Sequence, residues 1–168
     1  MKIAITGYSG SGKSTTARII GEKYNIPVLH LDSVHWLKNW QERNREESKK
    51  IVAHFMKENE SWVIDGNYKA FMQAERFEQA DIILYFSFNR FTCLLRAVKR
   101  WLEYRGSTRP DMTEGCNEKL DFEFIKWILW DGRTAEKQKN YKNMCNKYSK
   151  KVVILKNQRQ LDEFIKSL

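Results

Sequence analysis

The stretch Gly7-Tyr8-Ser9-Gly10-Ser11-Gly12-Lys13-Ser14 decides the fold of this chain. It matches the pattern G-x-x-x-x-G-K-[ST] at every specified position, and it stands between a short apolar run and a segment with helical apolar spacing. Glycines let the backbone curl until several N–H groups point at phosphate oxygens, and the following helix adds the positive end of its dipole. This context disfavours an ordinary Gly/Ser-rich turn. The stretch therefore predicts a phosphate-binding loop (P-loop).

Apolar runs and helical periodicities alternate along the rest of the chain. The expected strands are Lys2–Thr6, Pro27–Leu31, Trp62–Ile64, Ile82–Phe88 and Val152–Leu155. The expected helices are Lys13–Tyr24, Arg43–Glu58, Ala70–Gln79, Phe91–Tyr104, Asp121–Asn146 and Gln158–Leu168. Alternation of this kind predicts an α/β fold with three layers, in which helices cover both faces of a five-stranded parallel sheet. Gly7, Asp32, Asp65 and Ser87 end strands and should converge on one crevice at the carboxyl edge of the sheet.

Length and composition limit the class of protein. The 168 residues fit a single domain, 1–168, and 42% hydrophobic with 30% charged residues fit a globular protein rather than a disordered one. No apolar run reaches the ~20 residues that a membrane-spanning helix needs, so a cytoplasmic protein without a membrane partner is expected. Three widely spaced cysteines suggest neither a disulfide framework nor a zinc site. The sequence leaves the oligomeric state open.

The P-loop predicts binding of ATP and Mg²⁺. Lys13 should reach the β- and γ-phosphates, and Ser14 should ligate the metal. Asp65 ends an apolar strand in Trp62-Val63-Ile64-Asp65-Gly66 and is expected to hold Mg²⁺ as well, with an Asp-Gly turn as the alternative. The residues expected to bind ATP are Gly7, Tyr8, Ser9, Gly10, Ser11, Gly12, Lys13, Ser14 and Thr15.

Asp32 is the candidate for the acceptor side of the site. At the end of the second strand, it could take a proton from an acceptor hydroxyl, help position Mg²⁺ or the acceptor, or simply cap a helix or turn. His30, His35, Trp36 and Trp40 flank it, and they either contact a substrate or pack on the fold.

Arg96 and Arg100 lie four residues apart on one predicted helix, which puts both guanidinium groups on one helix face. The loop Gly106–Gly115 follows, and arginines that close over a moving phosphoryl group stabilise its charge. The alternative is a solvated basic helix face. The formal net charge of +9 comes from the second half of the chain, where basic residues are concentrated between Arg90 and Arg109 and between Arg133 and Lys151, so nucleic acid is a second polyanion to consider besides ATP.

Beyond the P-loop, further motifs follow in a familiar order: HLDSVHW (30–36), WVIDGNY (62–68), the Arg96-x-x-x-Arg100 helix, YRGSTRPDMTEGC (104–116) and DFEFIKWILW (121–130). On these motifs the chain resembles the adenylate-kinase-like P-loop kinases, and within them the small bacterial proteins labelled DNA topology modulation proteins. The resemblance implies the strand order 2-3-1-4-5 and a helical lid after strand four, around 101–120. It also implies phosphate contacts for Arg96 and Arg100 and gives Asp65-Gly66 the place of the strand-three Asp-Gly.

One departure limits what the resemblance implies. Asp65-Gly66 continues as Asn67-Tyr68 and not as the Phe-Pro-Arg that is typical of adenylate kinases, so specificity for AMP is not carried over. The sequence favours a kinase in which Lys13, Asp32, Arg96 and Arg100 serve transfer of the γ-phosphate to a small acceptor, such as a nucleoside, a nucleotide or another hydroxyl compound. A nucleotide-dependent DNA-associated regulator and a plain NTPase remain as alternatives.

Overall fold

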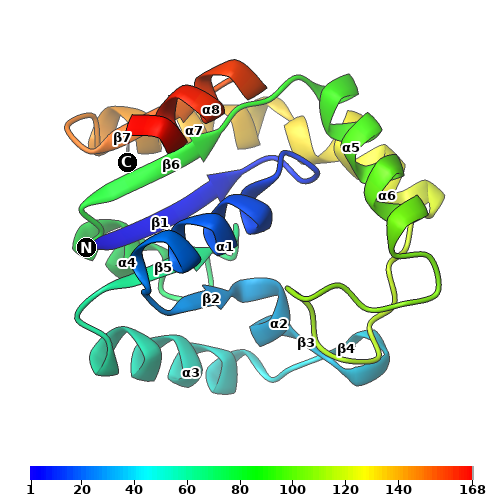
Figure 1. Cartoon of the computed structure of the whole chain (residues 1–168), viewed down its shortest axis with the longest axis horizontal. Coiled ribbons are helices and arrows are strands. Elements are labelled where there is room, and N and C mark those ends of the chain that lie inside the picture. The colour runs from blue at the N-terminus through cyan, green and yellow to red at the C-terminus, as the bar shows by residue number, and fades with distance from the viewer. Residues whose placement is uncertain (168) are drawn as a thin grey trace.

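A five-stranded parallel sheet forms the centre of the computed structural model, which describes residues 1–167 (Figure 1). Its strands lie in the order β2-β5-β1-β6-β7, which is 2-3-1-4-5 when only these five are counted, so the predicted order is confirmed. The central strand β1 pairs with β5 on one side and β6 on the other. The bounds are β1 Lys2–Gly7, β2 Val28–His30, β5 Trp62–Asp65, β6 Ile82–Phe86 and β7 Val152–Leu155.

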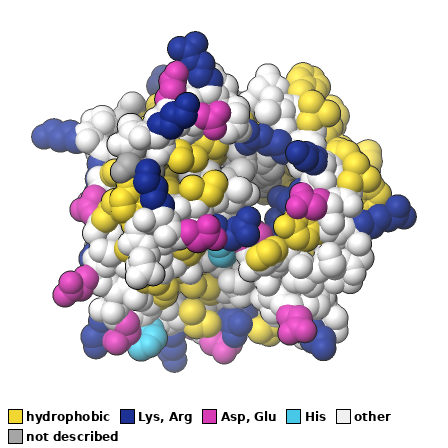
Figure 2. All heavy atoms as spheres, viewed as in Figure 1, with side chains coloured by type: hydrophobic (Ala, Val, Ile, Leu, Met, Phe, Trp, Pro, Cys, Tyr) yellow, Lys and Arg dark blue, Asp and Glu magenta, His cyan; other side chains and the backbone are white. Residues whose placement is uncertain are grey.

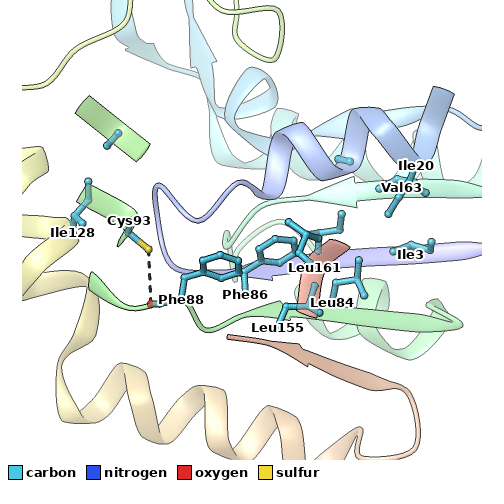
Figure 3. Packing of buried hydrophobic residues seen from close by; sticks show 13 residues of the cluster. Ile3, Ile20, Val63, Leu84, Phe86, Phe88, Cys93, Ile128, Leu155 and Leu161 are labelled. Carbon is cyan, nitrogen blue, oxygen red and sulfur yellow. Dashed lines mark hydrogen bonds between the residues drawn. The ribbon is translucent and has the colours of Figure 1, made fainter. Parts of the chain in front are cut away.

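Helices cover both faces of this sheet, because successive residues of a strand point to opposite faces. Ile3 and Ile5 of β1 join one core cluster and Ala4 joins the other. Figure 3 shows the first cluster, in which Phe86 and Phe88 stack beside each other. The first cluster draws on α1 Lys13–Tyr24, α5 Arg90–Glu103, α6 Phe122–Leu129 and α8 Gln158–Ser167. The second is covered by α2 Leu31–His35, α3 Arg45–Glu58, α4 Gln73–Gln79 and α7 Ala135–Lys147.

The single helix expected at Asp121–Asn146 is wrong, because the chain forms α6, the short η2 Asp131–Arg133 and then α7. Trp130 leaves the helical region with φ −132° and ψ −65°. Thr134 then caps α7 by accepting a hydrogen bond from the Lys137 N–H, as an N-cap threonine does. The break places the start of α7 beside the P-loop.

The segment between β2 and α3 also differs from the prediction. β2 ends at His30, and Asp32 lies in the first turn of α2 rather than at the end of a strand. A small antiparallel hairpin follows, formed by β3 Trp36–Leu37 and β4 Gln41–Glu42 around η1 Lys38–Trp40. Two helices begin later than predicted, α3 at Arg45 after the N-cap Asn44 and α4 at Gln73.

The long connection between α5 and α6, residues 104–121, crosses from the end of α5 toward α2 and the hairpin (Figure 1). The Thr113 hydroxyl donates to the carbonyl groups of Ser33 and Trp36, at 3.1 and 2.5 Å. The Cys116 thiol lies 3.1 Å from the Leu37 carbonyl oxygen. This connection therefore bridges the two sides of the carboxyl edge of the sheet.

Among residues 1–167, no helix combines the length and the apolar character that crossing a membrane requires.

Candidate functional site

The P-loop leaves β1 at Gly7 and curls back into α1 through three glycines with positive φ: 133° at Gly7, 75° at Gly10 and 98° at Gly12. A side chain at Gly10 would place its Cβ 2.5 Å from the Cys93 carbonyl oxygen of α5, so only glycine fits there. Gly12 is the N-cap of α1 and supplies no side chain to its first N–H groups. These N–H groups and the positive end of the helix dipole suit a phosphate anion.

Lys13 lies inside the loop, where its Nζ donates to the Tyr8 carbonyl at 3.0 Å. The pKa of Lys13 is lowered because burial penalises the ammonium ion, although the carboxylates of Asp65 and Asp32 oppose the shift. The charges of both predicted aspartates therefore act on the Lys13 ammonium group, whose direct hydrogen bond is to Tyr8.

Asp65, the last residue of β5, is buried beside the P-loop. His30 Nδ1 lies 3.2 Å from its Oδ2. Burial alone would raise the pKa of Asp65, but the hydrogen bond from His30, the charge of Lys13 and a hydrogen bond from Ser14 outweigh burial and lower it. The sequence did not indicate this contact of His30 with Asp65.

The predicted metal residues fit Mg²⁺. Oδ1 of Asp65 is buried without a hydrogen-bond partner, and the Ser14 hydroxyl approaches the same carboxylate. Mg²⁺ prefers hard oxygen ligands and keeps several waters, so one carboxylate and one hydroxyl beside bound phosphates are a sufficient set. No cluster of three or more His, Cys, Asp or Glu with metal-ligand geometry occurs within the described chain.

Asn67 clamps the start of the P-loop. Its Oδ1 accepts hydrogen bonds from the Thr6 hydroxyl and the Gly7 N–H, both at 2.9 Å, and its Nδ2 donates to the Gly7 carbonyl at 2.6 Å. In the sequence, Asn67 stands out only as a departure from the adenylate kinase pattern. A polar residue directly after Asp65-Gly66 was the one available signal for it.

Asp32 faces the crevice from α2 with 44% of its side chain exposed. The Tyr68 hydroxyl donates to its Oδ1 at 2.9 Å, and Arg109 Nη2 lies 4.0 Å from its Oδ2. Burial and the charge of Asp32 raise the pKa of Tyr68, so the phenol stays a donor. The structure thus gives Asp32 a fixed orientation and leaves one carboxylate oxygen reachable.

The two predicted lid arginines point to different partners. Arg96 donates to the Ser11 carbonyl of the P-loop and to Gln158, and its guanidinium carbon lies 4.4 Å from the centre of the Phe88 ring. Arg100 donates through Nε to Glu118 Oε1 at 2.7 Å. Both therefore lie near the crevice, one on the P-loop and one on the 104–121 connection.

Glu118 binds two arginines on that connection. The Glu118 side chain is 4% exposed, and its Oε2 lies 3.1 Å from Arg109 Nε. Arg109 also lies near Asp111, with 3.6 Å between Nη2 and the carboxylate. The pKa of Arg100 is lowered by burial and by Arg109, against the opposing charge of Glu118. Nothing in the sequence indicated Glu118, because it lies in irregular chain and its partners, Arg100 of α5 and Arg109, are 18 and 9 residues away.

The remaining aromatic and histidine candidates belong to the hairpin. Trp36 and Trp40 pack edge to face at 5.4 Å, and Lys119 lies 4.8 Å above the Trp40 ring. His35 packs on Trp36, with Nε2 3.8 Å from Glu42. The 104–121 connection packs against this hairpin. The space-filling view shows a hollow near the middle of this face of the molecule, with basic and acidic side chains at its rim (Figure 2).

Comparison with solved structures shows which fold the chain adopts. The structure superimposes on a shikimate kinase from Acinetobacter baumannii in complex with shikimate with a TM-score of 0.59, at 19% identity, covering 99% of this chain and 89% of the other. A shikimate kinase from Bacteroides thetaiotaomicron gives a TM-score of 0.53 at 18% identity, covering 99% and 95%.

Similarity at the level of sequence is local. A cytidylate kinase from Aquifex aeolicus (strain VF5) is 60% identical over 35 residues, which are 21% of this chain and 16% of that protein. No protein family model matches the chain. The superpositions extend over nearly the whole length, and they show that this chain has the P-loop kinase fold seen in shikimate kinases.

Proposed function

We propose that this protein is a kinase that transfers the γ-phosphate of ATP, bound with Mg²⁺, to a hydroxyl group of a small molecule. One observation carries the proposal: the P-loop residue Lys13 is within electrostatic reach of two aspartates, the buried Asp65 and the partly exposed Asp32. A site that only bound nucleotide would need the first aspartate but not the second. The similarity to shikimate kinases and to a cytidylate kinase supports the same class of reaction.

In the proposed reaction the acceptor oxygen forms a bond to the γ-phosphorus while the bond from that phosphorus to the β–γ bridging oxygen breaks. ADP leaves with the bridging oxygen, and the hydroxyl proton passes to Asp32. Among the described residues, Oδ2 of Asp32 has no hydrogen-bond donor, whereas Oδ1 is held by Tyr68, so Oδ2 is the oxygen that takes the proton. Loss of such a base costs about 10²–10⁴ in rate.

Charge stabilisation comes from the loop and the basic side chains. The P-loop N–H groups and Lys13 bind the β- and γ-phosphates, and Arg96 and Arg100 add positive charge on the α5 side. Bound Mg²⁺, held by Ser14 and Asp65, would neutralise part of the phosphate charge.

The connection between α5 and α6 is proposed to act as the lid, around 101–120. Many of its contacts are polar: the hydrogen bonds of Thr113 and Cys116 to the hairpin side, and the pairing of Arg100 and Arg109 with Glu118. Rearrangement of these polar contacts around bound substrates would close the lid and exclude water from the phosphoryl group. Cleavage by trypsin at Arg105 should slow when a bisubstrate analogue is added, and unchanged cleavage at saturation contradicts the lid.

Transfer of labelled phosphate from ATP to a panel of hydroxyl compounds tests the kinase proposal. Label that appears in an organic product supports it, and label that appears only in inorganic phosphate shows an NTPase. A matched reaction without acceptor measures the background hydrolysis that must be subtracted.

A nucleotide-dependent DNA-associated regulator is the second candidate, favoured by the lysine-rich α7 and by the resemblance to DNA topology modulation proteins. Part of the positive charge in and just after α7 is engaged within the fold: Lys147 pairs with Glu78 at 2.8 Å, and Lys151, four residues beyond the helix, donates to the carbonyl groups of Glu78 and Ala80. The kinase is therefore the first choice. A salt titration of duplex DNA binding decides, because phosphate contacts give a steep dependence on salt.

A further inference from the structure

The strands β2 and β5 end side by side in His30 and Asp65. The two residues are direct partners in the parallel register, so their side chains leave the sheet on the same face. His30 Nδ1 lies 3.2 Å from Asp65 Oδ2, and the two side chains are 13% and 5% exposed. The Ser33 hydroxyl donates to the His30 carbonyl at 2.7 Å and holds the chain where it leaves β2. The contact is therefore set by paired strand ends, which position side chains more precisely than loops do.

The hydrogen in this contact belongs to His30. The pKa of Asp65 is lowered, so its carboxylate is ionised at neutral pH, and an ionised carboxylate only accepts hydrogen bonds. Nδ1 must then carry the hydrogen, whether the ring is neutral or protonated. The hydrogen bond from His30 occupies Oδ2 of Asp65. Among residues 1–167, Oδ1 of the same carboxylate is buried and has no hydrogen-bond partner.

The hydrogen bond also decides which oxygen of Asp65 is offered to a ligand. The terminal torsion of an aspartate is soft, so a carboxylate that is not held can turn and exchange its two oxygens. With Oδ2 held by His30, Oδ1 is the oxygen that remains for a cation. A buried polar atom without a partner is costly, and a bound cation would complete it.

From this arrangement we infer that His30 is a positioning residue for the metal side of the site: by holding Oδ2 of Asp65, it presents Oδ1 to the divalent cation that is bound together with ATP. The inference rests on the part of the proposed function in which ATP is bound with Mg²⁺. His30 is not itself a ligand in this account, because Mg²⁺ prefers oxygen to imidazole nitrogen. Loss of a group that orients a metal ligand typically weakens metal binding about 10–100-fold.

Calorimetric titration of Mg²⁺ into the complex with a non-hydrolysable ATP analogue tests the inference, with protein in excess so that little free analogue competes for the metal. His30→Leu removes the donor and should weaken Mg²⁺ binding about 10–100-fold. His30→Asn should stay within about threefold of the wild type, because its amide places a donor close to the position of Nδ1. His54→Leu, on the exposed side of α3, is the matched control and should bind Mg²⁺ as the wild type does.

Binding of the analogue in EDTA separates positioning of the metal ligand from general support of the crevice. All variants should keep the metal-free affinity of the wild type, since His30 acts only through Asp65. Wild-type Mg²⁺ affinity in His30→Leu overturns the inference. An equal loss of Mg²⁺ affinity in His30→Leu and His30→Asn overturns it as well, and so does a parallel loss of affinity for the analogue in EDTA.

His30→Gln keeps the test decisive if His30→Leu does not fold. Its amide reaches about as far as Nε2 and not Nδ1, so it should bind Mg²⁺ more weakly than His30→Asn does, and equal affinities overturn the inference. Transfer of phosphate is measured separately. Mg²⁺ binding that depends on His30 in a protein without transfer overturns the kinase proposal and upholds this inference, whereas transfer with Mg²⁺ affinity independent of His30 does the reverse.

Discussion

Replacement of Asn67 by alanine should loosen the P-loop and lower the stability of the whole fold. The side chain makes three hydrogen bonds to Thr6 and Gly7, two as acceptor and one as donor. Each such bond contributes about 1 kcal/mol net, and the buried Gly7 N–H would lose its partner. Because Asn67 itself is exposed, water can replace some of the lost hydrogen bonds. The expected loss in free energy of unfolding is therefore about 2–3 kcal/mol.

Urea unfolding followed by circular dichroism measures the loss, which should shift the midpoint by roughly 1 M at an unchanged slope. Asn146→Ala, at an exposed position of α7, is the matched control and should leave the midpoint almost unchanged. ATP affinity measured at low denaturant should fall for Asn67→Ala only. A stability loss below about 0.5 kcal/mol, the range of ordinary surface changes, would refute the clamp.

Three further predictions concern the charged residues of the crevice. Asp32→Asn should leave ATP affinity nearly unchanged by calorimetry and lower transfer by about 10²–10⁴, whereas transfer at the native rate would place the base elsewhere. Lys13→Ala should abolish ATP turnover in a folded protein, which circular dichroism confirms; undiminished turnover contradicts the P-loop assignment. The lowered pKa of Asp65 means that its charged form stabilises the fold above the unfolded-state pKa of about 3.9, and this contribution is lost as the pH falls through the lower folded-state value. Acid unfolding below about pH 4 should therefore be less steep in Asp65→Asn than in the wild type, and equal slopes contradict the shift.

The sheet and the P-loop could be predicted because their signals are local. Each strand is a short apolar run with its own boundary, and the glycine spacing of the loop has one structural explanation. The segment 31–42 shows neither the helical nor the strand periodicity of apolar residues. Its hairpin contacts residues such as Thr113 that are about 80 positions away in the sequence. The break before α7 could have been predicted from the turn pair Asp131-Gly132 and the N-cap residue Thr134. The helical apolar spacing on either side of them indicated one continuous helix instead.

The candidate site divides in the same way. Lys13 and Asp65 follow from motif and strand end, and the structure brings them together. The partners that orient the other groups, His30, Tyr68 and Glu118, come from other parts of the chain and have no spacing rule to identify them. Four-residue spacing correctly placed Arg96 and Arg100 on one helix, but their different directions are set by Ser11 and Glu118.

The close approach of Gly10 to the Cys93 carbonyl has a consequence for the order in which the protein acquires its activity during synthesis. The loop occupies the first positions of the chain, yet its shape is fixed against a helix more than eighty residues later, and the strand that precedes it lies between β5 and β6. A nascent chain that has left the ribosome only as far as α4 lacks β6 and α5. Nucleotide binding should therefore appear on the growing chain as a late step, after α5 has emerged, although its residues are among the first to be translated.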